Sequence, residues 1–209
     1  MTFLPSGGWP RPYHRDFTGR HGTLTPRIVK AARDSRVTLS AAKQFMVIDH
    51  DEDNNLINGM IDTAFAWLQP PTGCLAASIN TQTLRIDLPA WPPIGIHLPA
   101  GPVQKINSVK YFDDANADQT LDAANYFLDY DVLLWSQTFA APNIYQRPSA
   151  VRIEYDAGMS DEEFNAALGM AMLRIVKQLY DNRDELTAGM TFDAEVFGVD
   201  ALIRPWLVR

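Results

Sequence analysis

The chain has 209 residues, a formal net charge of −7 at pH 7 and one cysteine. That length fits one domain with an extension, and it can bury a hydrophobic core without disulfides. Cys74 has no partner for an internal disulfide, which favours a reducing compartment, and it is typical of a small buried or strand residue. The first residues lack the apolar core of a secretory signal, and no run approaches the roughly 18 apolar residues of a membrane span. We therefore expect a soluble protein that is not exported by the usual route and has no membrane partner.

Positive charge is concentrated at the start of the chain. Residues 1–36 hold seven Arg or Lys against two Asp, a balance of +5, whereas residues 37–209 hold eleven against 23 acidic residues, a balance of −12. Gly and Pro recur too often before about residue 26 for a long regular element, so we predict an extended basic arm over residues 1–36. Such an arm suits docking onto nucleic acid or onto the acidic body of a neighbouring copy, and a solvated tail is the alternative.

The rest of the chain, residues 37–209, is predicted to form one domain with helices at both ends. Four stretches favour helices, chiefly through the spacing of their apolar residues. We predict helices over about residues 38–47, 52–68, 161–186 and 193–203. Thr38 is a good N-cap for the first helix, and Ser160 with Glu163 forms the pattern of a capping box at the start of the third.

The middle of the chain changes character. Short β-branched and aromatic runs alternate with polar residues and are separated by Pro and Gly between about residues 76 and 157. This pattern predicts five to seven short antiparallel strands in a compact β subdomain. The fold class is therefore α+β: a small bundle of three to four helices with an inserted antiparallel β subdomain, preceded by the extended arm.

The stretch VIDHDEDNNLIN places four carboxylates and a histidine within five residues. A calcium loop would need Gly at its sixth position and Glu at its twelfth, but counting from Asp49 these are Asn54 and Met60. A transition-metal site would need paired His or Cys, which the sequence lacks. Carboxylates in the first turn of a helix instead stabilise its positive end. We interpret the stretch as the charged start of the second helix, with a second possible role against a basic surface on a neighbour.

No active site is predicted. The sequence has no GxSxG, phosphate loop, dinucleotide glycine pattern or HExxH, and we expect no metal and no cofactor. An enzyme of unrecognised type would have only the acidic stretch and Cys74 to work with.

The carboxyl-terminal residues are apolar at a chain end. Leu202, Ile203 and Trp206 would suit insertion into a partner if they were exposed, and packing back onto the domain is the alternative. On the first interpretation, deletion of residues 203–209 is expected to leave the fold intact.

Several stretches taken in order resemble the head-to-tail connector, or adaptor, proteins of long-tailed bacteriophages and gene transfer agents. They are VTLSAAKQFMVIDHDEDNNLINGMIDTAFAWLQPPTG, IHLPAGPVQKINSVKYFDDANADQTLDAANYFLD, RPSAVRIEYDAG and LRIVKQLYDNRDEL. The resemblance covers about residues 36–209 and depends on the order and spacing of these pieces. The arm departs from the shorter family pattern.

The resemblance implies a non-enzymatic ring protein, typically dodecameric, at the head-tail junction of a particle assembled in the bacterial cytoplasm. Such a ring docks beneath the portal, extends the channel through which DNA passes, and offers a platform for the next neck, stopper or tail protein. The family pattern assigns portal binding to the carboxyl-terminal stretch, here Leu202, Ile203, Pro205, Trp206 and Leu207.

Two further expectations come from charge. Ring contact or arm docking is expected to pair two groups of residues, Arg11, Arg15, Arg20 and Arg27 with Asp51, Glu52 and Asp53. The alternative function is a nucleic-acid-binding module that uses the basic arm, in which arginines interleave with Trp9 and Tyr13.

Overall fold

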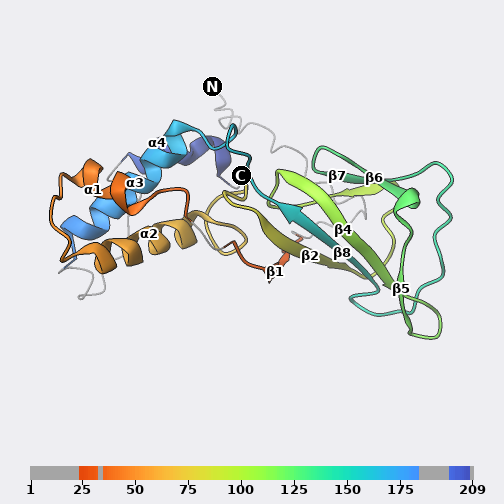
Figure 1. Ribbon diagram of the computed structural model, residues 1–209. Coiled ribbons are helices and arrows are strands. Elements are labelled where there is room, and N and C mark those ends of the chain that lie inside the picture. The colour runs from red at the N-terminus through yellow and green to blue at the C-terminus, as the bar shows by residue number, and fades with distance from the viewer. Residues whose placement is uncertain (1–23, 33–34, 184–197, 208–209) are drawn as a thin grey trace, which may run out of the picture.

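The computed structural model describes residues 24–32, 35–183 and 198–207. Helices gather at one end of an elongated molecule and the strands at the other (Figure 1). The chain enters through an edge strand, crosses to the helical end, returns to build the β subdomain, and then crosses back for the last helices. The α+β class and the inserted antiparallel β subdomain predicted from the sequence are confirmed.

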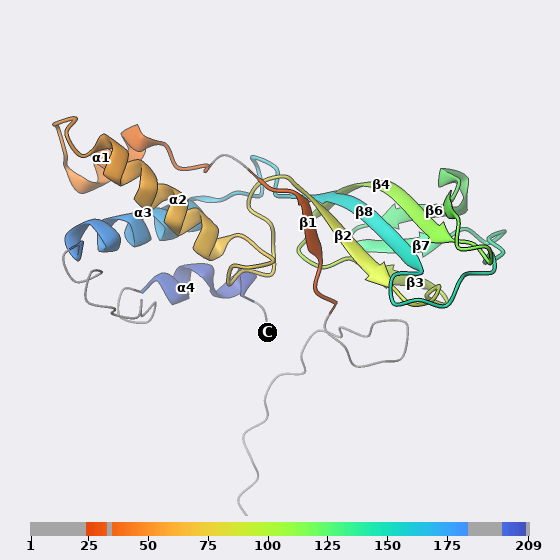
Figure 2. The same cartoon turned by 90° about the horizontal axis from the view of Figure 1, so that it is seen from below.

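The helical end is built from α1 (Leu39–Met46), α2 (Asn54–Leu68), α3 (Ala166–Asp181) and α4 (Val199–Ile203), and α4 continues into a short 3-10 turn, η4 (Arg204–Trp206). Residues at helical spacing on α2 and α3 form one shared core, among them Ile57, Ile61, Leu168 and Ile175. Figure 2 shows α4 lying beside α3 at this end of the molecule. Burial of these apolar side chains is what stabilises helices this short.

Two helices begin later than the sequence predicts, and for α3 a local side-chain cap explains the difference. Ser160 and Glu163 do form the reciprocal capping box, with Glu163 Oε2 2.7 Å from the Ser160 N–H, but the box closes a turn. Helix α3 begins only at Ala166, because the side-chain oxygen of Asn165 accepts hydrogen bonds from the N–H groups of Ala167 and Leu168 at 3.0 and 3.2 Å. Helix α2 begins at Asn54 rather than at residue 52.

At the other boundaries, α3 ends at Asp181 rather than at residue 186, and the predicted helix over residues 193–203 is seen as α4 from Val199 to Ile203. Residues 184–197 lie outside the described residues.

Seven strands lie within residues 76–157, all of which the structure describes. They are β2 (Gln82–Leu88), β3 (Gly95–His97), β4 (Val103–Phe112), β5 (Asp118–Thr120), β6 (Tyr126–Asp129), β7 (Val132–Trp135) and β8 (Val151–Ala157). An additional strand, β1 (Arg27–Lys30), pairs antiparallel with β2. The sheets have the orders β1-β2-β8-β4-β5 and β3-β7-β6. Strand β1 comes from the predicted arm, so that part of the arm belongs to the folded body.

Strands β2 and β8 alternate strictly between buried and partly exposed residues. Their inward residues build a second core, separate from the helical one, that includes Leu84, Ile86, Ile153 and Tyr155. The buried Tyr155 hydroxyl donates to the Pro99 carbonyl oxygen at 2.8 Å, and burial raises the pKa of this tyrosine above its usual value. The outward residues of the same strands are polar or charged.

Buried polar side chains join the two ends of the molecule. Gln69, just after α2, accepts a hydrogen bond from the Ile79 N–H at 2.8 Å. Gln82, at the start of β2, donates to the Pro70 carbonyl oxygen at 2.7 Å and to the Ser78 hydroxyl at 2.9 Å. Because buried donors and acceptors are costly to leave unpaired, these bonds fix the β subdomain relative to the helices.

Candidate assembly surfaces

The carboxyl-terminal segment packs onto its own domain as far as Leu207. Val199 and Ile203 are buried in the helical core, and Leu202, Trp206 and Leu207 pack against it while partly exposed. Leu207 forms an isolated antiparallel bridge with Leu75. The Ala76 N–H donates to the Trp206 carbonyl oxygen at 2.7 Å. The sequence left two alternatives for this segment, insertion into a partner or packing onto its own domain, and as far as Leu207 the segment packs onto its own domain.

This packing divides the residues predicted to bind the portal. Ile203 is only 1% exposed, so it supports the segment from inside and cannot contact a partner without leaving the core. Pro205 is exposed, and Leu202, Trp206 and Leu207 each keep part of their surface. The expectation that residues 203–209 can be removed without effect on the fold is therefore corrected, since the deletion would take Ile203 from the core.

The acidic stretch lies in a turn between α1 and α2 at the far end of the helical bundle (Figure 1). Asp51 accepts a hydrogen bond from Lys43 Nζ at 2.7 Å and another from Asn54 Nδ2 at 3.1 Å. The bond from Lys43 is the main reason why the pKa of Asp51 lies below its ordinary value. Glu52 lies 3.0 Å from His50 Nδ1. The stretch thus holds one ion pair, between Asp51 and Lys43, and beside it a contact between Glu52 and the His50 imidazole.

Asp53 occupies the N-cap position of α2 but makes no side-chain hydrogen bond to the helix backbone. Its carboxylate accepts instead from the Tyr180 hydroxyl at 2.6 Å, which joins the start of α2 to the end of α3. This bond is the first cause of the raised pKa of Tyr180. The predicted capping role of the acids is therefore corrected: they precede the first turn of α2, and Asp51 and Asp53 accept hydrogen bonds from side chains of α1 and α3.

We next consider metal binding, a reactive thiol and a membrane span in the part of the chain that the structure describes. No group of three His, Cys, Asp or Glu residues is placed to hold a metal ion there. Cys74 is half-buried, and burial raises the pKa of its thiol, which disfavours the nucleophilic thiolate. No helix in the described ranges is long and apolar enough to cross a membrane.

Of the arm residues predicted to meet the acidic turn, the described one, Arg27, is not brought to it within one chain. Arg11, Arg15 and Arg20 lie outside the described residues. Arg27 is on β1, where its Nε lies 3.4 Å from Asp87 Oδ2 of the neighbouring strand. Figure 1 places β1 well away from the α1–α2 turn. A contact between Arg27 and the acidic turn would therefore need a second copy.

Sequence reasoning missed a cluster of arginines on the outer face of the larger sheet. Arg27, Arg85 and Arg152 come from β1, β2 and β8, and Arg147 comes from the loop before β8. The alternating patterns RID and RIE indicated that Arg85 and Arg152 lie on the outward faces of their strands. These patterns do not indicate which strands are neighbours in the sheet.

Comparisons with known proteins identify relatives only at the level of structure. No protein-family model matches the sequence, and no curated protein matches it either. A chain in the neck of an empty GTA particle, computed with C6 symmetry, is 21% identical with a TM-score of 0.67, over 89% of this chain and 97% of that one. A chain in the virion of a native gene transfer agent (GTA) particle is 20% identical with a TM-score of 0.65, over the same 89% and 97%.

A third chain, from the neck of a native GTA particle computed with C12 symmetry, has a TM-score of 0.56 at 21% identity and covers 89% of this chain and 97% of that chain. The resemblance seen in the sequence is thus confirmed for the fold, which this protein shares with chains of gene transfer agent particles. The match covers nearly the whole of each of those chains, so it is not limited to one common motif.

Proposed function

We propose that this chain is a structural subunit of the neck at the head-to-tail junction of a phage-like particle, with no catalytic role. The observation that carries the proposal is the fold shared with neck chains of gene transfer agents over almost their full length. The hydrogen bonds that join the helical and β ends of the molecule support it, because a subunit of a symmetric assembly needs fixed geometry.

The subunit assembles into a ring, for which we propose twelve copies. The particles that contain the similar chains were computed with C6 and C12 symmetry, and both are compatible with twelve copies around one axis. A cyclic ring needs two different complementary surfaces on each copy. The basic arm and the acidic turn supply one such pair, in which Arg11, Arg15, Arg20 and Arg27 of one copy would approach Asp51, Glu52 and Asp53 of the next.

The ring lies beneath the portal, extends the DNA channel and offers a platform for the next neck or tail protein. The balance of −12 over residues 37–209 suits a conduit, because carboxylates repel phosphate and do not retain a passing duplex. Portal contact would use the exposed part of the carboxyl-terminal segment. This part consists of Leu202, Pro205, Trp206 and Leu207, which Ile203 supports from the core.

The test is electron microscopy of the purified protein at high concentration, with and without purified portal. We expect twelvefold rings alone or rings bound to portal. A protein that stays monomeric at high concentration and does not bind portal would contradict the proposal. To test the portal contact separately, the exposed Pro205 can be replaced by Ser, with Ile203 and Trp206 left in place so that the packing of the helical core is kept.

DNA binding by the basic arm is the second candidate function, favoured by the balance of +5 in residues 1–36. DNA binding by the arm is tested by deletion of residues 1–23. Residues 27–30 are kept because they form β1. Duplex affinity that falls steeply with salt and is lost in this deletion would support the arm as a DNA-binding element. Equal affinity with and without residues 1–23 would exclude it.

A further inference from the structure

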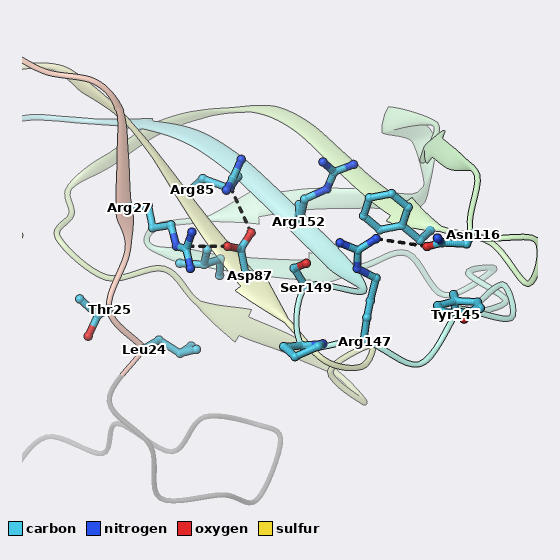
Figure 3. Close-up of a pocket in the computed structure, with 13 residues that line it drawn as sticks. Leu24, Thr25, Arg27, Arg85, Asp87, Asn116, Tyr145, Arg147, Ser149 and Arg152 are labelled. Carbon is cyan, nitrogen blue, oxygen red and sulfur yellow. Dashed lines mark hydrogen bonds and ion pairs between the residues drawn. The ribbon is translucent and has the colours of Figure 1, made fainter.

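A cavity of about 870 Å³ lies on the outer face of the five-stranded sheet (Figure 3). Four arginines line it, and they come from three strands and one loop. They are Arg27, Arg85, Arg147 and Arg152. The remaining lining side chains include the hydroxyl groups of Thr25 and Ser149 and a single carboxylate, that of Asp87. In a chain with a net charge of −7, this is a local reversal of sign.

The carboxylates that contact these arginines are too few to neutralise them. Arg27 and Arg85 share Asp87, with Nε to Oδ distances of 3.4 and 3.0 Å. Arg152 pairs with Asp118 at 2.5 Å. Arg147 donates to the neutral side-chain oxygen of Asn116 at 3.1 Å, as the dashed line in Figure 3 shows. Four guanidinium groups therefore contact two carboxylates, and an excess of positive charge faces the cavity.

Two of the arginines are held in place before any ligand binds. The guanidinium carbons of Arg147 and Arg152 lie 3.9 and 4.5 Å from the ring centre of Phe112, within cation–π distance. Arg152 Nε is buried and has no hydrogen-bond partner. Arginines fixed in this way lose little freedom on binding, and their planar forks match carboxylate oxygens in pairs.

We infer that this arginine cavity binds the carboxylates of a short acidic segment presented by a second copy of the chain. Residues 37–209 carry a balance of −12, so a neighbouring copy offers acidic surface at many positions. A ring requires each copy to offer two complementary surfaces, and this inference rests on the ring proposed above. The cavity thus provides a basic surface for ring contact to which the arm contributes Arg27 and the body contributes Arg85, Arg147 and Arg152.

Duplex DNA fits the same cavity poorly. Asp118 lies beside Arg152, and Glu154 lies opposite Arg85 in the register of β2 and β8. These two carboxylates lie beside two of the arginines and would repel an extended polyanion, whereas a narrow segment can place a few side chains against the arginines alone. A carboxylate segment is therefore favoured over phosphate.

The first experiment measures binding of a fluorescently labelled hexaglutamate peptide to the full-length chain by anisotropy at low salt. The protein is kept dilute so that it does not assemble. The test variants are Arg147→Gln, which lies outside the arm, and the double variant Arg27→Gln, Arg147→Gln. The control is Lys30→Gln, which removes the same charge from an exposed position of β1 that does not line the cavity. A thermal melt of each variant checks the fold, and Arg27 is exposed enough to be replaced without harm.

We expect the double variant to bind the peptide at least tenfold more weakly and the control to bind it normally. Equal binding by all variants, or no binding by the wild-type chain, would overturn the inference. Tighter binding of a short duplex with the same charge, lost in the same variants, would overturn it in favour of a phosphate site.

The second experiment compares ring formation by the wild-type chain, Arg147→Gln, the double variant and the control. Loss of rings in both cavity variants, with rings kept in the control, supports the assignment to a second copy. Rings that form normally in the double variant overturn that assignment, even if peptide binding is lost. If no form of the chain makes rings, the proposed function fails, and the peptide result still decides whether the cavity binds carboxylates.

Discussion

Replacement of Ile203 by Ala tests whether the carboxyl-terminal segment belongs to the helical core. Ile203 is 1% exposed and packs in the same cluster as α2 and α3. Isoleucine-to-alanine changes in cores cost about 2–5 kcal/mol, and the short α4 can relax partly into the space, so we expect about 2–3 kcal/mol. In a chain of this size each kcal/mol lowers Tm by about 2–4 °C, which predicts a fall of about 4–12 °C.

The assay is thermal unfolding followed by circular dichroism, with Arg204→Ala as the control. Arg204 neighbours Ile203 but is exposed, and its ion pair with Asp200 spans 3.7 Å, so its loss should change stability by about 0.5 kcal/mol or less. An Ile203→Ala protein with the Tm of the wild type would refute the docking of α4. An unchanged Tm would also favour the other alternative, in which the carboxyl-terminal segment inserts into a partner.

Three other changes test particular bonds. Gln69→Leu leaves the buried Ile79 N–H without its acceptor and should lower the free energy of unfolding by about 1–3 kcal/mol, measured by urea denaturation. Tyr155→Phe leaves the Pro99 carbonyl without its donor and should cost about 0.5–1.5 kcal/mol in the same assay. Asp51→Asn should lower Tm slightly at neutral pH, because a carboxylate with a depressed pKa stabilises the fold above its ordinary value of 3.8. The difference from wild type should close as the pH falls below 3.8 toward the lowered pKa, and a difference that persists there would refute the ion pair with lysine.

Local patterns predicted the elements well where neighbouring residues decide the outcome. The Thr38 N-cap of α1 forms as expected, with its side chain accepting from the Ala41 N–H at 3.2 Å. The alternation in QTLRIDL and VRIEYDA predicted strands with one buried face, and both strands have it. These signals succeed because capping and periodicity depend on residues only a few positions apart.

Competing local signals account for the errors. Ser160–Glu163 and Asn165 are both good capping sites five residues apart, and the sequence does not rank them. The acids before α2 were predicted to stabilise the positive end of the helix dipole. In the structure, Asp51 accepts a hydrogen bond from Lys43, and Asp53 accepts one from Tyr180. A partner that comes from another helix cannot be recognised in the pattern of one stretch.

The sequence alone determined the fold class, the order of helices and strands, and the division into a basic start and an acidic body. These properties follow from composition and from the spacing of apolar residues along the chain. Only the tertiary structure decided that Ile203 is buried and that arginines at positions 27, 85, 147 and 152 meet in one cavity. The reason is physical: strand pairing and helix packing bring distant residues together, and the sequence order does not state which ones meet.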